Sequence, residues 1–220
     1  MFCSPEISRI EYGHDYPYLV ECMKNWRKPS YRLWWFMRTY LEIVKPMNLP
    51  RGSRILSVGI GMGHVEQFLA NPFGYDVTGI DFSSSSLEIA NSLFGSKINT
   101  VLADALSLPF RKGAFDGVVS IDFMEHLPNL SSAKTALGEM DRVLKDDCSM
   151  LHKITVLGED GMDADRTHHI KQSADVWRDW FNANGWKTYR ALNHRVPIWQ
   201  RRKLGFYPVK GAFYIRKQSK

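Results

Sequence analysis

The sequence of 220 residues is poor in cysteine and in long apolar runs. Its three cysteines, Cys3, Cys22 and Cys148, are scattered and odd in number, so they form neither a disulfide framework nor a zinc-ligand spacing. No apolar run approaches the roughly 18 residues that a membrane-spanning helix needs. The first residues also lack the layout of a signal peptide. These absences favour a protein of a reducing, cytoplasmic compartment.

Acidic residues are missing from one part of the chain. From Trp180 to the end there are ten Lys or Arg residues and no Asp or Glu, whereas the residues before Trp180 carry a net charge of −4. This asymmetry favours an anionic partner near the C-terminal part, such as a phosphate, a nucleic acid or a lipid headgroup at a membrane surface. The alternative is a basic face that only meets solvent.

The length and the hydrophobic content of 44% fit one soluble globular domain with a sizeable core. Residues 31–45 have the pattern of an amphipathic helix. Leu33 and Tyr40 belong to its apolar half, and Trp35 lies among the charged residues of the other half. We expect residues 1–50 to form a helical cap or lid, and residues 51–220 to form the ligand-binding domain.

From residue 54 onward, strand patterns alternate with helix patterns. Such repeated β–α units predict an α/β fold, a doubly wound and mostly parallel sheet with helices on both faces. The expected strands are 54–58, 75–81, 98–104, 115–122, 150–156, 186–192 and 211–218, and the expected helices are 63–70, 83–94, 131–144 and 173–184.

The stretch ILSVGIGMGHVEQFLA, residues 55–70, places Gly59, Gly61 and Gly63 in one turn between a strand and a helix. Glycine adopts positive φ readily and lets a ligand lie against the main chain. Asp81 ends the next strand, 18 residues after Gly63, where a carboxylate meets ribose hydroxyls in nucleotide-binding sheets. The dinucleotide fingerprint would need its third glycine at His64, and no Lys-Ser/Thr pair follows as a phosphate-binding loop requires.

Six segments carry a wider resemblance, and they occur in this order: ILSVGIGMG, VTGIDFS, VLADALSLPF, FDGVVSIDFMEHLPN, LGEMDRVLKDD and DRTHHIKQSADVWRDWFNANGWK. Over about residues 52–186 the sequence resembles the class I S-adenosylmethionine-dependent methyltransferases, especially those that act on small molecules. The resemblance implies a Rossmann-like methyltransferase fold with a seven-stranded sheet whose last strand is antiparallel. It also implies S-adenosylmethionine as the cofactor and S-adenosylhomocysteine as its product.

The resemblance further implies which residues surround the cofactor. The glycines admit the methionine moiety, Asp81 binds the ribose, and the residues after the second and third strands lie beside the adenine. The whole set is Ser57, Gly59, Gly61, Gly63, Asp81, Phe82, Ser83, Asp104, Ala105, Asp122 and Phe123. Relatives usually have Asp or Glu where Ser57 stands, and that carboxylate supports the amino group of the methionine. We therefore expect weaker cofactor binding here.

Methyl transfer mainly needs the acceptor atom to be aligned with the methyl group. A hydroxyl acceptor must also lose its proton, and a histidine is the natural base near neutral pH. His126, His168 and His169 are the candidates for catalysis, and all are expected on the carboxyl side of the sheet. His168 and His169 with Asp163 and Asp165 offer an alternative metal site, but these carboxylates lack a metal-ligand spacing, so no metal is expected.

The expected acceptor is a hydroxyl or amine of a small metabolite, glycan or natural product, and the basic C-terminal part favours an anionic one. A lipid or nucleic acid is the alternative acceptor. Nucleic acid is disfavoured because the fourth strand ends in SIDFMEH, without an Asn/Asp-Pro-Pro-aromatic motif. A protein that binds the cofactor without transferring methyl groups is the rival from another class, and Ser57 allows it. The sequence leaves monomer and homodimer open.

Overall fold

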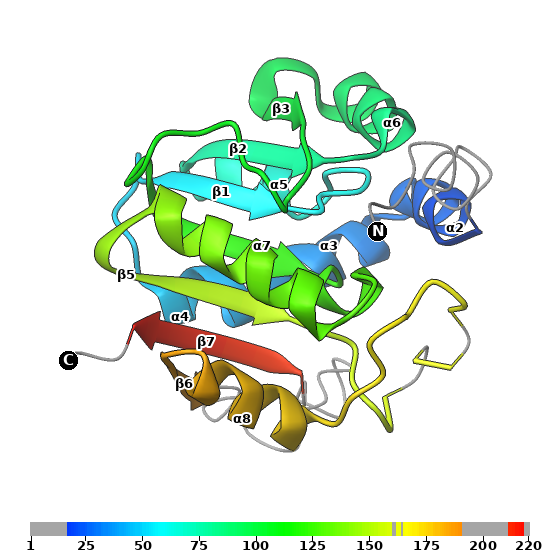
Figure 1. The fold of residues 1–220 in the computed structure, drawn as a ribbon. Helices are drawn as coiled ribbons and strands as arrows, with labels where there is room; N and C mark the ends of the chain where they lie inside the picture. Colours follow the sequence, from blue (N-terminus) through cyan, green and yellow to red (C-terminus); the bar gives the residue numbers. More distant parts are fainter. Residues whose placement is uncertain (1–16, 160–161, 164, 191–210, 218–220) are drawn as a thin grey trace, which may run out of the picture.

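The computed structural model describes residues 17–159, 162–163, 165–190 and 211–217. A seven-stranded sheet with the order β3-β2-β1-β4-β5-β7-β6 forms its centre (Figure 1). Strands β1 to β5 pair in parallel, whereas β7 runs antiparallel to both β5 and β6. The mostly parallel sheet with an antiparallel last strand is thereby confirmed. The strands are β1 Arg54–Val58, β2 Asp76–Asp81, β3 Asn99–Leu102, β4 Phe115–Ile121, β5 Leu144–Lys153, β6 Trp186–Arg190 and β7 Ala212–Lys217.

The helices connect these strands as the alternating pattern predicts. They are α2 Pro17–Trp26, α3 Pro29–Arg38, the π-helix η1 Thr39–Val44, α4 Lys45–Met47, α5 Glu66–Ala70, α6 Ser84–Phe94, the 3₁₀-helices η2 Gly95–Lys97 and η3 Met124–His126, α7 Leu130–Val143 and α8 Ala174–Ala183. Some boundaries differ from the prediction: α5 begins at Glu66 instead of 63, and β5 ends at Lys153 instead of 156. The largest difference is that β5 begins at Leu144 instead of 150. A bulge explains the difference, because Phe115 pairs with Leu144 whereas Gly117 pairs with Ser149.

Helices cover both faces of the sheet, because successive residues of the central strands point to opposite sides. Leu56, Val118 and Met150 belong to the core on the side of α7 and α8. Their neighbours Ile55, Val119 and Leu151 belong to the core on the side of α3, η1, α4 and α5. Figure 1 shows α7 in front of the sheet and α3 behind it. The expected α/β architecture with helices on both faces is confirmed.

The predicted apolar face of the helix over 31–45 is wrong in part: Ile43 is buried as expected, but the face is rotated toward Trp35. The buried side chains are Trp35, Thr39, Ile43 and Met47, each four residues after the last, whereas Leu33 is 61% exposed and Tyr40 is 40% exposed. The wide π-helical turn of η1 keeps every fourth residue on the sheet side, where a 3.6-residue period would rotate it away. Thr39 is buried without cost to its hydroxyl, which donates to the Trp35 carbonyl at 2.8 Å.

Two expectations concern the basic C-terminal residues and membrane-spanning segments. The basic residues Arg195, Arg201, Arg202 and Lys203 lie outside the described residues. No helix within the described ranges is long and apolar enough to cross a membrane.

Candidate functional site

The glycine turn lies at the carboxyl ends of the parallel strands, next to Asp81. Gly59, Gly61 and Gly63 have φ of 74°, 52° and 74°, in the left-handed region that favours glycine. The Gly61 amide donates to Asp81 Oδ2 at 2.9 Å, and the Ser83 amide donates to Asp81 Oδ1 at 2.9 Å. Asp81 thus fixes the turn to the start of α6. Each carboxylate oxygen can accept a second hydrogen bond, so the pair retains acceptor capacity for ribose hydroxyls.

Neighbouring side chains account for two of these glycines. A Cβ on Gly59 would lie 2.6 Å from Phe123 Cδ2, and a Cβ on Gly63 would lie 3.2 Å from Ala90 Cβ. Phe123 is one of the predicted site residues, and it packs directly on the turn. The glycine spacing therefore serves both the turn and the contact between the ends of β1 and β4.

A buried carboxyl group adjoins Ser57. The Ser57 hydroxyl donates to Glu66 Oε1 at 2.6 Å, and both side chains are buried. Burial raises the pKa of Glu66 to about 7, against the smaller opposing effect of the Ser57 hydrogen bond. Position 57 on β1 thus has no carboxyl group of its own, but the carboxyl group of Glu66 on α5 lies directly beside it. The sequence signal for Glu66 was an acidic residue within an otherwise apolar helix start, and our sequence analysis missed it.

The residues expected beside the adenine follow β2 and β3. Phe82 is 43% exposed and Ala105 is buried, while Ser83 caps α6 by accepting from the Ser86 amide. The exposed Asp104 accepts from the Leu106 amide at 2.8 Å. These positions line the edge that the resemblance implies, and their contact with a cofactor stays a prediction.

Asp122 follows the last residue of β4 and has a strained conformation, with φ of 49°. Its carboxylate forms an ion pair with the Lys153 ammonium and accepts from the Thr155 hydroxyl at 2.9 Å. Burial alone would raise the pKa of Asp122, but the Lys153 ammonium outweighs this effect and lowers it. Lys153 and Thr155 were not predicted, although Lys153 ends β5 and therefore falls on the same carboxyl edge.

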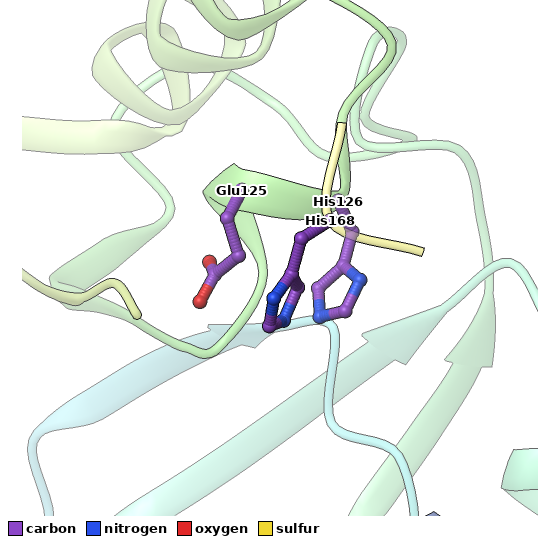
Figure 2. A group of neighbouring side chains, drawn as sticks. All are labelled: Glu125, His126 and His168. Atoms are coloured by element: carbon purple, nitrogen blue, oxygen red, sulfur yellow. The ribbon is translucent and has the colours of Figure 1, made fainter. Parts of the chain in front are cut away.

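Two of the three predicted histidines lie together, whereas the third is apart. Figure 2 shows Glu125, His126 and His168 pointing into one space, and the two imidazole rings have centroids 4.7 Å apart. Burial lowers the pKa of His126 to about 4 and raises the pKa of Glu125 to about 8. His169 has an exposed side chain and meets this group only through its backbone amide, which donates to the Glu125 carbonyl at 2.9 Å.

A fourth histidine, His64, follows the glycine turn and packs against α3. His64 is buried, and its ring lies 4.1 Å from the Trp35 ring, centroid to centroid. Burial lowers the pKa of His64 to about 4. Neither of its ring nitrogens has a hydrogen-bond partner among the described residues. The sequence analysis used His64 only to reject the dinucleotide fingerprint and did not consider it as a site residue.

Comparison with known proteins shows which family and which solved structures parts of the chain resemble. Residues 56–151 match the methyltransferase domain family. O-methyltransferase resE of Aspergillus sclerotiorum is 34% identical over 109 residues, 47% of this chain and 40% of that protein. An O-methyltransferase of Pyrenophora dematioidea is 26% identical over 174 residues, 73% of this chain and 64% of that protein. The chain thus spans less than two thirds of the length of these relatives.

Solved structures agree with the fold. A SAM-dependent methyltransferase from Aquifex aeolicus superposes with a TM-score of 0.62 at 19% identity, covering 89% of this chain and 95% of that chain. The matched segment begins within β1 and ends within β5, so it contains the glycine turn, Asp81 and the end of β4. Residues 56–151 thus match a methyltransferase domain, and the sheet around them has the fold of solved S-adenosylmethionine-dependent methyltransferases.

Proposed function

We propose that the protein transfers the methyl group of S-adenosylmethionine to an oxygen atom of a small metabolite. The observation that carries the proposal is the glycine turn held to Asp81 at the carboxyl ends of β1 and β2. In α/β sheets this edge is where nucleotide-like ligands bind. The names of the relatives, two of them O-methyltransferases, support oxygen over the amine that remains the second candidate.

The residues at the edge fit such a cofactor. The Asp81 carboxylate can accept from ribose hydroxyls while it holds the Gly61 and Ser83 amides. Glu66 supplies a carboxyl group beside Ser57, near the part of the turn that would meet the methionine moiety. Phe82, Asp104 and Ala105 remain the proposed adenine contacts. When bound, S-adenosylmethionine supplies a methyl group already activated by its sulfonium sulfur.

The acceptor side is proposed at the ends of β4 and β5. Phe123 packs there on the glycine turn, directly after Asp122. His126 follows in η3, and His168, from the loop after β5, lies beside it with the two ring centroids 4.7 Å apart. We keep His126 and His168 for this side because they face a common space, and we drop His169 because its side chain is exposed. Of the basic residues behind the expectation of an anionic acceptor, Lys187, Arg216 and Lys217 lie in β6 and β7, whereas Arg195, Arg201, Arg202 and Lys203 lie outside the described part of the chain.

Transfer of a labelled methyl group tests the proposal. The protein is incubated with methyl-labelled S-adenosylmethionine and a small-metabolite extract, and fragmentation mass spectrometry locates the label on oxygen or nitrogen. We expect a labelled ether or ester with the wild type and with Asp76→Asn, an exposed position on the same strand, and little with Asp81→Asn. Cofactor binding without any labelled product would instead support a protein that binds the cofactor and transfers nothing.

A further inference from the structure

Glu125, His126 and His168 form a compact cluster of metal-ligand types. Each offers one ligand atom, and these atoms all lie within 4.8 Å of one another. Glu125 and His126 belong to the short helix η3, while His168 comes from the loop between β5 and α8. Figure 2 shows the three side chains extending in the same direction from these two segments. Residues more than 40 positions apart in sequence are thus gathered around one point.

Both imidazoles are held in the tautomer that suits a metal. His168 Nδ1 lies 3.0 Å from the Met162 carbonyl oxygen, and His126 Nδ1 lies 3.2 Å from the Thr167 carbonyl oxygen. A carbonyl oxygen only accepts, so each Nδ1 carries the proton and each Nε2 keeps the lone pair. A metal-bound histidine commonly donates its other ring N–H to a backbone carbonyl in this way.

Thr167 reinforces this assignment for His126. Its hydroxyl oxygen lies 2.9 Å from His126 Nδ1 and 2.6 Å from Asp165 Oδ1. Because the carboxylate can only accept, the hydroxyl donates its hydrogen to Asp165 and its oxygen accepts from His126. The arrangement Asp165–Thr167–His126 therefore orients the ring through a second layer of hydrogen bonds, as the outer layer of a metal centre does.

Glu125 supplies an independent indication of a cation site. Its side chain is fully buried, and Oε1 accepts from the Thr155 amide. Its other oxygen, Oε2, is buried and has no hydrogen-bond partner within the described ranges. A buried carboxylate oxygen without a partner is costly. A cation bound at Oε2 would satisfy it.

The surrounding charges suit a dication. Besides Glu125 itself, the carboxylates of Asp122 and Asp165 lie near the cluster, and the cation that adjoins it on β5, Lys153, is already paired with Asp122. Two imidazole nitrogens and one carboxylate oxygen favour zinc, manganese or ferrous iron over magnesium or calcium, which prefer all-oxygen sites. Zinc binds such ligands at about 2.0–2.2 Å. The three atoms must therefore draw together somewhat when a metal binds.

We propose that Glu125, His126 and His168 bind one divalent transition-metal ion, represented by Zn²⁺. Three protein ligands leave a coordination position open, as in catalytic zinc sites. The ion would tie η3 to the loop after β5 next to the end of β4. A role in polarising an acceptor oxygen there rests on the proposed function, whereas the binding itself does not, so binding is measured without any methyl donor.

Calorimetric titration with ZnCl₂ of the full, untagged chain, first stripped of metal by a chelator, tests the site. We expect one zinc ion per chain for the wild type, and affinity lower by at least about tenfold for Glu125→Gln and for His168→Gln. His169→Gln is the matched control, because it removes the neighbouring histidine whose side chain is exposed. This variant should bind zinc like the wild type.

Cobalt substitution keeps the test decisive if a variant fails to fold. Co²⁺ bound to the wild-type chain should show the intense visible absorption of a low-coordinate site, and excess Zn²⁺ should remove it. Absence of stoichiometric zinc binding, or a spectrum like that of hydrated Co²⁺, would overturn the proposal. So would equal zinc affinity in Glu125→Gln, His168→Gln and His169→Gln. Methyl transfer could then still be present, so the two proposals fail separately.

Discussion

At the scale of single residues, Ser57 and Glu66 must be considered as a pair. The sequence alone suggests that a serine in place of the usual carboxylate weakens cofactor binding. The 2.6 Å hydrogen bond from Ser57 to the buried Glu66 changes this expectation. A buried carboxyl group thus lies beside Ser57, on the helix that follows the strand.

Ser57→Asp should destabilise the protein for this reason. The new carboxylate would lie within hydrogen-bond distance of Glu66 in a buried space, where two carboxylates cannot both ionise. We expect the free energy of unfolding to fall by about 1–3 kcal/mol, measured by urea denaturation. Glu66→Gln in the same background should recover part of the loss. A Ser57→Asp protein as stable as the wild type, with tighter cofactor binding, would show that the pocket has room for both groups.

Glu66 should also make stability depend on pH. Burial gives it a folded pKa of about 7 against an ordinary value of 4.5, so the folded protein holds the proton more tightly than the unfolded chain. Its contribution is therefore fully present below about pH 4.5 and is lost as pH rises through about 7. Relative to Glu66→Gln, the wild type should lose up to about 3 kcal/mol over that interval. A difference between the two proteins that does not vary with pH would contradict this.

At the scale of elements, the glycine turn connects the ends of β1, β2 and β4. Gly61 is bound to Asp81, while Gly59 is covered by Phe123 from the end of β4. A side chain at Gly59 thus meets two obstacles, a positive φ and the Phe123 ring.

Gly59→Ala and Gly52→Ala separate these obstacles. Gly52 has a similar φ of 83°, and a Cβ there would meet nothing within 4 Å. Gly52→Ala should cost about 1–2 kcal/mol from backbone conformation alone. Gly59→Ala should cost clearly more and should also weaken cofactor binding. Phe123→Ala added to Gly59→Ala should reduce the excess. Equal thermal denaturation of the two single variants would remove Phe123 from the turn.

Trp35 on α3 is either part of a lid over the acceptor or part of the protein core. The sequence placed this indole among charged residues and allowed it to be part of a lid over the acceptor. In the structure Trp35 is only 6% exposed, and its ring lies 4.1 Å from His64 and 4.9 Å from Trp34, centroid to centroid. This burial is typical of core packing.

Trp35→Ala should therefore lower the free energy of unfolding by about 3–5 kcal/mol. Leu33→Ala, on the same helix and 61% exposed, should change it by less than about 0.5 kcal/mol. Thermal denaturation of both variants measures the contrast. If Trp35→Ala kept the wild-type melting temperature and changed only the kinetics with an acceptor, the lid would be the better description.

At the scale of the whole molecule, the fold followed from the sequence much further than the site did. The predicted strand over 54–58 has the same first and last residues as β1, because Gly52 before it and Gly59 after it mark where a strand can begin and end. The sequence also predicts that the glycine turn and Asp81 lie at the same edge of the sheet, and in the structure Gly61 and Asp81 are in contact there. The period of residues 31–45 was misjudged because a π-helical turn has no signal in hydrophobic spacing.

The charged and imidazole pairs at the ends of β4 and β5 could not be predicted, because their members are distant in sequence. Asp122 meets Lys153, and Glu125 meets His168, only because β4 and β5 are neighbours in the sheet and their following segments share one edge. A linear pattern carries the identity of each residue but not which buried carboxylate faces which cation or imidazole. Those pairings require the register of the strands.

The account depends most on a cofactor site at the glycine turn, and titration of the protein with S-adenosylhomocysteine tests that claim directly. Calorimetry should show one molecule bound per chain. Asp81→Asn should weaken binding by about 10–150-fold, the equivalent of about 1.5–3 kcal/mol for a charged hydrogen-bond acceptor. Asp76→Asn, exposed at the other end of β2, should leave it unchanged. No binding to the folded wild type, or the same affinity in both variants, would contradict the account.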